Sequence, residues 1–176
     1  VLDSNGSPGL ALSRVAVRVE LTRVALLDGT RLRGAWGDWP EPSELLAGVP
    51  DPLPPDLDRV PARLRPLLAA DSEAAVLGWH GPHGPFALPG YWDATGWAQV
   101  PTVALRLGGA LSAGPACLTV ETSGTRPSSV RGLQLNGLGR ARSDDATTRV
   151  TIAAERTVWW SGDDSGTLRT PVAPNA

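Results

Sequence analysis

The sequence predicts a mainly β fold with one or two helices, in which the strands form a closed or partly closed antiparallel barrel. Two observations predict it. About six strand-like segments follow one helical segment, separated by turns rich in Gly, Pro and Ser at regular spacing. Alternating strand–helix–strand units are absent from the pattern, which disfavours a parallel sheet.

The first 40 residues predict a hairpin segment. Arg14–Leu21 alternates apolar and polar residues, which is typical of a half-buried strand. Asp28-Gly29 stands between two alternating arms, a strong signal for a hairpin turn. The pattern of residues 14–33 also resembles that of residues 149–169. Residues 1–40 are therefore either the tail of a preceding barrel in a tandem protein or extra strands of this one, unless the similarity arises by chance between two amphipathic hairpins.

Residues 41–56 are rich in proline and predict a linker, so that residues 57–176 form a barrel domain with a leading helix. The helix is predicted by the roughly helical spacing of Leu57, Val60, Leu64, Leu67 and Leu68. Pro66 lies inside that pattern and is expected to kink or split the helix.

The strands of the barrel are predicted from apolar runs between turns. We expect them at residues 74–79, 85–93, 100–107 and 116–121, with a closing pair at 126–142 and 149–169. HGPHG, residues 80–84, is expected to form a turn. Trp159 and Trp160 are adjacent in a strand, so one should fill the core while the other faces a groove, a partner or a ligand.

Composition excludes several classes of function. The 176 residues carry a net charge of −2, which gives no reason to expect nucleic acid or an anionic membrane as a partner. Every basic residue except the two histidines is arginine, which excludes Schiff-base chemistry on lysine and is typical of a bacterial, GC-rich genome. One Cys and two His allow no internal disulfide and no ordinary zinc site.

The sequence predicts a cytoplasmic protein. It contains neither a long apolar run nor a secretory signal pattern at its start. It also contains no methionine, which indicates a fragment, a processed chain, or a GTG start translated literally.

Four segments carry a resemblance to a known family. They are HGPHG with its flanking strands, ALRLGGALSAGPACLTVE, RPSSVRGLQLNGLGRAR and VWWSGDDSGTLR. Over about residues 54–169 these resemble the pyridoxamine-5'-phosphate-oxidase-like family, the flavoproteins with an FMN-binding split barrel. The resemblance implies an antiparallel split barrel, a homodimer that buries one barrel face, and flavin sites built across that interface.

The resemblance also implies the residues of a cofactor site. It places Arg106 and Ser112 near a flavin phosphate, Ser128 and Ser129 beside the isoalloxazine ring, and Trp160 and Arg169 near its edge. The turn after Arg106 reads GGALSAGP and lacks the basic residue usual in the family, so phosphate binding would depend on Arg106, Arg126 or Arg131.

The leading hypothesis is an FMN- or deazaflavin-dependent oxidoreductase in which the cofactor supplies the chemistry, so that no catalytic side chain is assigned. The alternative is a non-catalytic binding or interaction module that has lost its cofactor site. A third reading is a split barrel that binds haem through His80 or His83.

Other reactive residues have simpler interpretations. His80 and His83 are expected to face solvent in their turn. Cys117 lies in an apolar run and is expected to be a buried, inert thiol. Asp163 and Asp164 are expected to form a hydrophilic hairpin tip.

Overall fold

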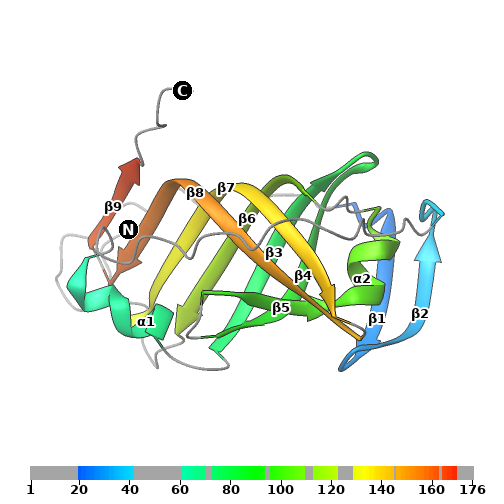
Figure 1. Cartoon of the computed structure of the whole chain (residues 1–176), viewed down its shortest axis with the longest axis horizontal. Helices are drawn as coiled ribbons and strands as arrows, with labels where there is room; N and C mark the ends of the chain where they lie inside the picture. Colours follow the sequence, from blue (N-terminus) through cyan, green and yellow to red (C-terminus); the bar gives the residue numbers. More distant parts are fainter. Residues whose placement is uncertain are drawn as a thin grey trace, which may run out of the picture.

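The computed structural model describes residues 20–41, 61–69, 73–93, 96–109, 113–122, 129–144, 146–162 and 164–169. Within this part, seven strands form one antiparallel sheet in the order β5-β4-β3-β6-β7-β8-β9, and β5 also pairs with β8. This additional pairing closes β3 to β8 into a ring, which confirms the predicted antiparallel split barrel (Figure 1). The strands are β3 (Glu73–Gly81), β4 (Gly84–Trp92), β5 (Ala98–Pro101), β6 (Ala113–Thr122), β7 (Arg131–Asp144), β8 (Thr147–Ser161) and β9 (Asp164–Arg169).

Strand β8 shares one of its edges between two partners. Its first residues pair with β5, from Thr147 to Val150, whereas Arg156–Ser161 pair with β9. Its other edge pairs with β7 over nearly its whole length. The barrel is therefore closed along the first part of β8 and extended by the β8–β9 hairpin along the second.

The first two strands form a separate two-stranded sheet beside the barrel. β1 (Arg23–Asp28) and β2 (Arg31–Gly37) are joined by the predicted turn, in which Gly29 adopts a left-handed φ of +58°. Arg23 links this hairpin to the barrel, because its Nη2 donates a 3.0 Å hydrogen bond to the carbonyl of His83. Its guanidinium also lies 5.4 Å from the ring centroid of Trp39.

The described part of the leading helix is divided, as Pro66 predicts. A 3₁₀ turn, η2 (Ala62–Leu64), runs directly into α1 (Arg65–Ala69), and Leu64 and Leu67 are buried in the barrel core. Arg63 fastens this segment to the β8–β9 hairpin. Its guanidinium lies 4.7 Å from the ring centroid of Trp159 and forms an ion pair with Asp164.

The prediction of a strand at residues 100–107 is wrong for most of that range. Only β5 is extended there, and Thr102–Leu107 form the helix α2, with Pro101 as its N-cap residue. Proline suits a helix start because its missing N–H needs no partner there, and glycine favours a helix end. Gly108 follows the helix, so both signals were present, but the alternation of Val103, Leu105 and Leu107 matches a strand equally well.

The barrel interior is filled by aliphatic side chains and two large aromatic ones. Trp92 is 1% exposed and is the largest of the fully buried side chains. The core takes residues from every strand of the ring and from both helices: Leu64, Leu67, Leu77, Trp79, Leu88, Trp92, Val100, Leu105, Leu118, Val120, Leu133, Leu135, Val150 and Ile152. In the described residues no helix is long and apolar enough to cross a membrane.

Several tryptophan rings cover glycines, which explains part of the unusual tryptophan content. Trp160 lies across from Gly132, and Trp159 lies across from Gly166, as directly paired residues of neighbouring strands. A Cβ on Gly132 would lie 2.3 Å from Trp160 Cζ2, so the indole occupies the space that a side chain would need. As expected for adjacent strand residues, Trp159 packs against the core while Trp160 lies on the outer face.

Replacing Gly132 by alanine is expected to displace the Trp160 ring. The new Cβ forces the indole to move, and overpacking of this kind costs about 1–3 kcal/mol of unfolding free energy. We expect a lower melting temperature and a changed tryptophan emission spectrum. Leu138→Ala, on the exposed face of the same strand, is the control, and a Gly132→Ala protein that melts with the parent would contradict the ring's placement.

Other predicted segments lie outside the described residues. These are most of the Arg14–Leu21 strand, most of the linker at 41–56, and the helical positions Leu57 and Val60. The relation of residues 14–33 to residues 149–169 therefore stays a prediction, as does the division of the chain into a hairpin segment, a linker and a barrel domain.

Candidate functional site

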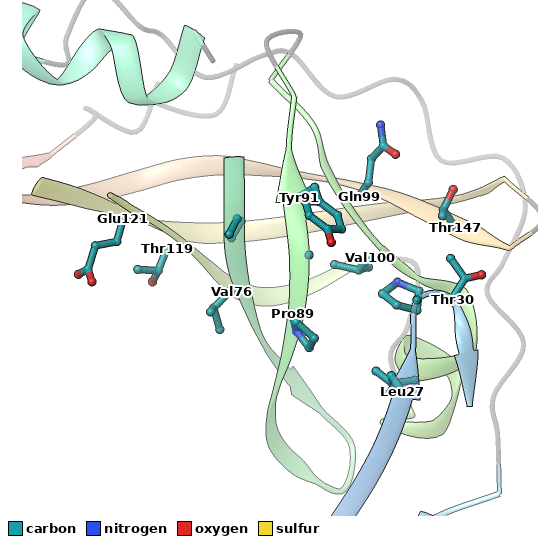
Figure 2. Close-up of a pocket in the computed structure, with 15 residues that line it drawn as sticks. Leu27, Thr30, Val76, Pro89, Tyr91, Gln99, Val100, Thr119, Glu121 and Thr147 are labelled. Atoms are coloured by element: carbon teal, nitrogen blue, oxygen red, sulfur yellow. The ribbon is translucent and has the colours of Figure 1, made fainter. Parts of the chain in front are cut away.

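A groove of about 640 Å³ runs along the outside of the barrel wall. It extends from the tip of the β1–β2 hairpin, across β3, β4 and β5, to the end of β6 (Figure 2). Figure 2 shows Leu27 and Thr30 at one end and Thr119 and Glu121 at the other. The described lining residues are Leu27, Gly29, Thr30, Ala74, Ala75, Val76, Pro89, Gly90, Tyr91, Gln99, Val100, Pro101, Thr119, Glu121 and Thr147.

Beside the groove, β4 pairs with β5 over a short stretch. Only Tyr91 and Trp92 of β4 pair with β5, and the residue before them is Gly90. A Cβ on Gly90 would lie 2.7 Å from both the carbonyl oxygen of Gln99 and Cγ1 of Val100. Glycine thus permits the close approach of β4 to β5.

The walls of the groove are apolar and exposed. Val76 on β3 is 49% exposed and Tyr91 on β4 is 62% exposed, and Pro89 is exposed beside them. Directly paired residues place Pro89 opposite Val76, so the two side chains share the outer face. Exposed apolar side chains gathered in a concave surface mark a binding site more often than isolated ones do.

Polar side chains also line the groove, and three of them are oriented by hydrogen bonds. Gln99 donates from Nε2 to Oδ2 of Asp93 at 3.3 Å, which orients its amide. Thr119 accepts a 3.3 Å hydrogen bond from Nε2 of Gln134. Glu121 accepts a 3.2 Å hydrogen bond at Oε2 from the indole Nε1 of Trp160. The groove therefore combines an apolar slot with a few oriented polar groups, the usual build of a small-molecule site.

Arg106, predicted to bind a phosphate, lies on α2 and is exposed. Helix α2 begins after Pro101, which pairs with Thr147 at the start of β8. Trp160 is 13 positions further along β8, roughly 40 Å along a strand. Arg106 and Trp160 therefore lie toward opposite ends of the barrel, and one chain does not bring them together.

The other predicted residues gather around the far end of β8. Arg131 pairs with Ser161, Ser129 lies two residues before it and is exposed, and Arg169 pairs with Arg156. None of these is among the described residues that line the groove. Trp160 reaches the groove indirectly, through its hydrogen bond to Glu121. Ser112, Arg126 and Ser128 lie outside the described residues.

The histidines and the cysteine lie outside the described groove lining. His80 and His83 are both exposed. The turn between β3 and β4 is shorter than predicted, because only Pro82 and His83 form it, while His80 and Gly81 belong to β3 and Gly84 to β4. Cys117 is partly exposed, which corrects the prediction of a buried thiol, and it lies directly opposite Gly78. No cluster of three potential metal ligands occurs within the described ranges.

Sequence reasoning missed the groove residues. Val76 and Tyr91 are ordinary strand residues in isolation. Pro89 with Gly90 was expected to break the register of its strand, yet β4 stays in register with β3 through both residues. One signal was available: in YW the tyrosine must face outward if Trp92 faces inward. Tyr91 and Val76 lie on the same face because of the register of β3 against β4. Short-range sequence patterns do not give that register.

Comparison with known proteins adds likenesses of fold. No family model and no curated protein matches the chain. A haem binding protein from Mycobacterium smegmatis is similar in structure, with 12% identity and a TM-score of 0.45, over 58% of this chain and 55% of that one. The chain thus spans about half the length of that protein.

A second similar structure is a protein from Clostridium acetobutylicum, described as related to general stress protein 26 of B. subtilis and of the pyridoxine-phosphate oxidase family. It shares 17% identity and a TM-score of 0.39, over 56% of this chain and 86% of that one. The assignment of the fold rests on the strand order and ring closure of this chain itself.

Proposed function

We propose that the outer groove binds the ring system of a flavin or deazaflavin, and that the protein acts as an oxidoreductase with that cofactor. The observation that carries the proposal is the groove itself. Its volume of about 640 Å³ lies within the range of roughly 300–1,000 Å³ typical of small-molecule sites. Its walls are an exposed tyrosine, a valine and a proline, which suit a flat, mainly apolar ligand.

The residues present fit the ring better than they fit a phosphate. Tyr91 and Val76 supply apolar surface, and Gln99 and Thr119 supply an amide and a hydroxyl for the polar edge of a ring. Among the described lining residues there is no arginine, although a phosphate ordinarily binds a guanidinium or several N–H donors. When bound, the cofactor supplies the hydride chemistry. This chain orients the ring and shields one of its faces.

A homodimer located in the cytoplasm belongs to the same proposal. Val76, Pro89 and Tyr91 of the groove are exposed, so a second subunit would cover a bound ring and limit its contact with water. The dimer would also present each groove to side chains of the other copy.

Replacing Tyr91 by alanine is expected to weaken flavin binding about tenfold, because the largest apolar side chain of the groove is lost. Binding is measured by the change in flavin fluorescence on titration with purified protein. Leu138→Ala removes an exposed apolar residue from another part of the outer surface and should bind as the parent does. If the parent protein is colourless and leaves the fluorescence of added flavin unchanged, the proposal fails.

The second candidate is a non-catalytic binding module, and one observation favours it. Among the described groove residues none is histidine, cysteine or a basic residue, so few groups there are suited to proton transfer. Bound flavin that no nicotinamide or other hydride donor can reduce would support this candidate over an oxidoreductase. A Soret band in the purified protein would instead indicate haem, for which His80 and His83 are the available ligands.

A further inference from the structure

One carboxylate determines the charge of the groove. Glu121 lies at the end of β6 and is the one charged side chain among the described residues that line the groove. Figure 2 shows it at the end remote from the β1–β2 hairpin. The other polar lining side chains are hydroxyls and one amide, which carry no net charge.

The Glu121 side chain is held in place from outside the groove. Its Oε2 accepts the hydrogen bond from Trp160, whose ring extends over Gly132 on the intervening strand β7. The indole is restrained because it occupies the space above Gly132. Indole N–H is a donor only, so it bonds the carboxylate without neutralising its charge. One carboxylate oxygen is engaged in this way, and a carboxylate has lone pairs for further donors.

Resting on the proposed function, we infer that the groove selects an uncharged or cationic planar ligand that donates a hydrogen bond to Glu121, and that it disfavours anionic ligands such as flavin phosphates. An anion in the groove would be repelled by Glu121, and no basic side chain of the described lining would offset that repulsion. A neutral ring with an N–H at its edge instead satisfies the carboxylate.

Riboflavin and FMN test this inference, because they share one ring system and differ by a phosphate. Riboflavin should bind the parent protein about tenfold more tightly than FMN at low ionic strength. Added salt should reduce this difference in affinity, because it screens the repulsion between Glu121 and the phosphate. Glu121→Gln keeps the size of the side chain and removes its charge, so the two ligands should bind that variant within about twofold of each other. Both measurements use flavin fluorescence, and the salt dependence is read on the unaltered protein.

Trp160→Phe serves as the matched variant for the positioning role of the indole. It keeps a ring over Gly132 but removes the N–H donor that fixes Glu121. We expect a weaker preference for riboflavin in this variant, with FMN binding little changed. If Trp160 had a purely structural role, the substitution would weaken the binding of riboflavin and of FMN equally.

The outcomes separate this inference from the proposed function. FMN binding as tightly as riboflavin, or more tightly, would overturn the inference while leaving flavin binding intact. If neither flavin binds, the proposed function is wrong. The predicted preference of the groove for uncharged over anionic ligands is then tested with a neutral naphthalene dye and a sulfonated one. A preference for the neutral dye that disappears in the Glu121→Gln variant would support the inference. Equal binding of the two dyes, or no binding of either, would overturn it.

Discussion

Trp92→Ala is expected to be the most destabilising single substitution on the barrel wall. Trp92 is the largest fully buried side chain, and it lies on β4 where that strand pairs with both β3 and β5. Truncating a buried tryptophan costs about 3–5 kcal/mol of unfolding free energy, because apolar contacts are lost and a cavity remains. A domain of this size has about 5–15 kcal/mol in total.

Thermal unfolding followed by circular dichroism measures this effect. For a chain of this length we expect the melting temperature to fall by roughly 10 °C or more. The neighbouring Tyr91→Ala is the control, because Tyr91 faces the groove and its loss should leave stability nearly unchanged while it weakens ligand binding. Equal melting temperatures for the two variants would show that the two faces of β4 have been assigned wrongly.

Gly137→Ala is also expected to lower the free energy of unfolding strongly, because the new side chain would collide with the backbone. The register of β7 against β8 shifts between Asn136 and Gly137, so that Glu155 is an extra residue on β8. A Cβ on Gly137 would lie 2.0 Å from the carbonyl oxygen of Ala153, which belongs to the main chain and cannot turn aside. We therefore expect a cost at the upper end of about 1–3 kcal/mol.

Urea unfolding measures this cost, with Leu138→Ala as the control one residue further along the strand. Leu138 is 37% exposed, so its truncation should change the midpoint little. The bulge also separates the part of β8 that pairs with β5 from the part that pairs with β9. We expect Gly137→Ala to disturb the β8–β9 hairpin, visible as faster amide exchange there, and an unchanged exchange pattern would contradict this role.

The fold was largely predictable because strands and turns leave local signals. Asp28-Gly29 predicted its hairpin, and the apolar run at residues 74–79 predicted β3. Helix α2 was missed because its apolar residues alternate over a stretch too short to distinguish two periods. The pairing of β5 with β8, which closes the ring, joins residues about fifty positions apart, and no short-range pattern specifies it.

The candidate site was hardly predictable at all. Its walls come from Val76, Pro89 and Tyr91, whose proximity follows from strand register, and its charge comes from Glu121 near a strand end. Trp160 was singled out for its unusual position in a tryptophan pair, and it is not among the described lining residues but bonds the carboxylate of Glu121, which is. Sequence patterns identify residues of unusual type, whereas this groove is made of common residues in an uncommon arrangement.

The pairing of β5 with β8 has a consequence for how the chain folds during synthesis. A ribosome that has completed β3 to β6 has made about half of the barrel wall, yet the strand that closes the ring begins only at Thr147. Until β8 emerges, the inner faces of β4 and β5 stay open, and an open apolar sheet is prone to aggregation. Because the closing contacts are distant in sequence, we expect slow folding and poor recovery of any chain truncated before Ser161.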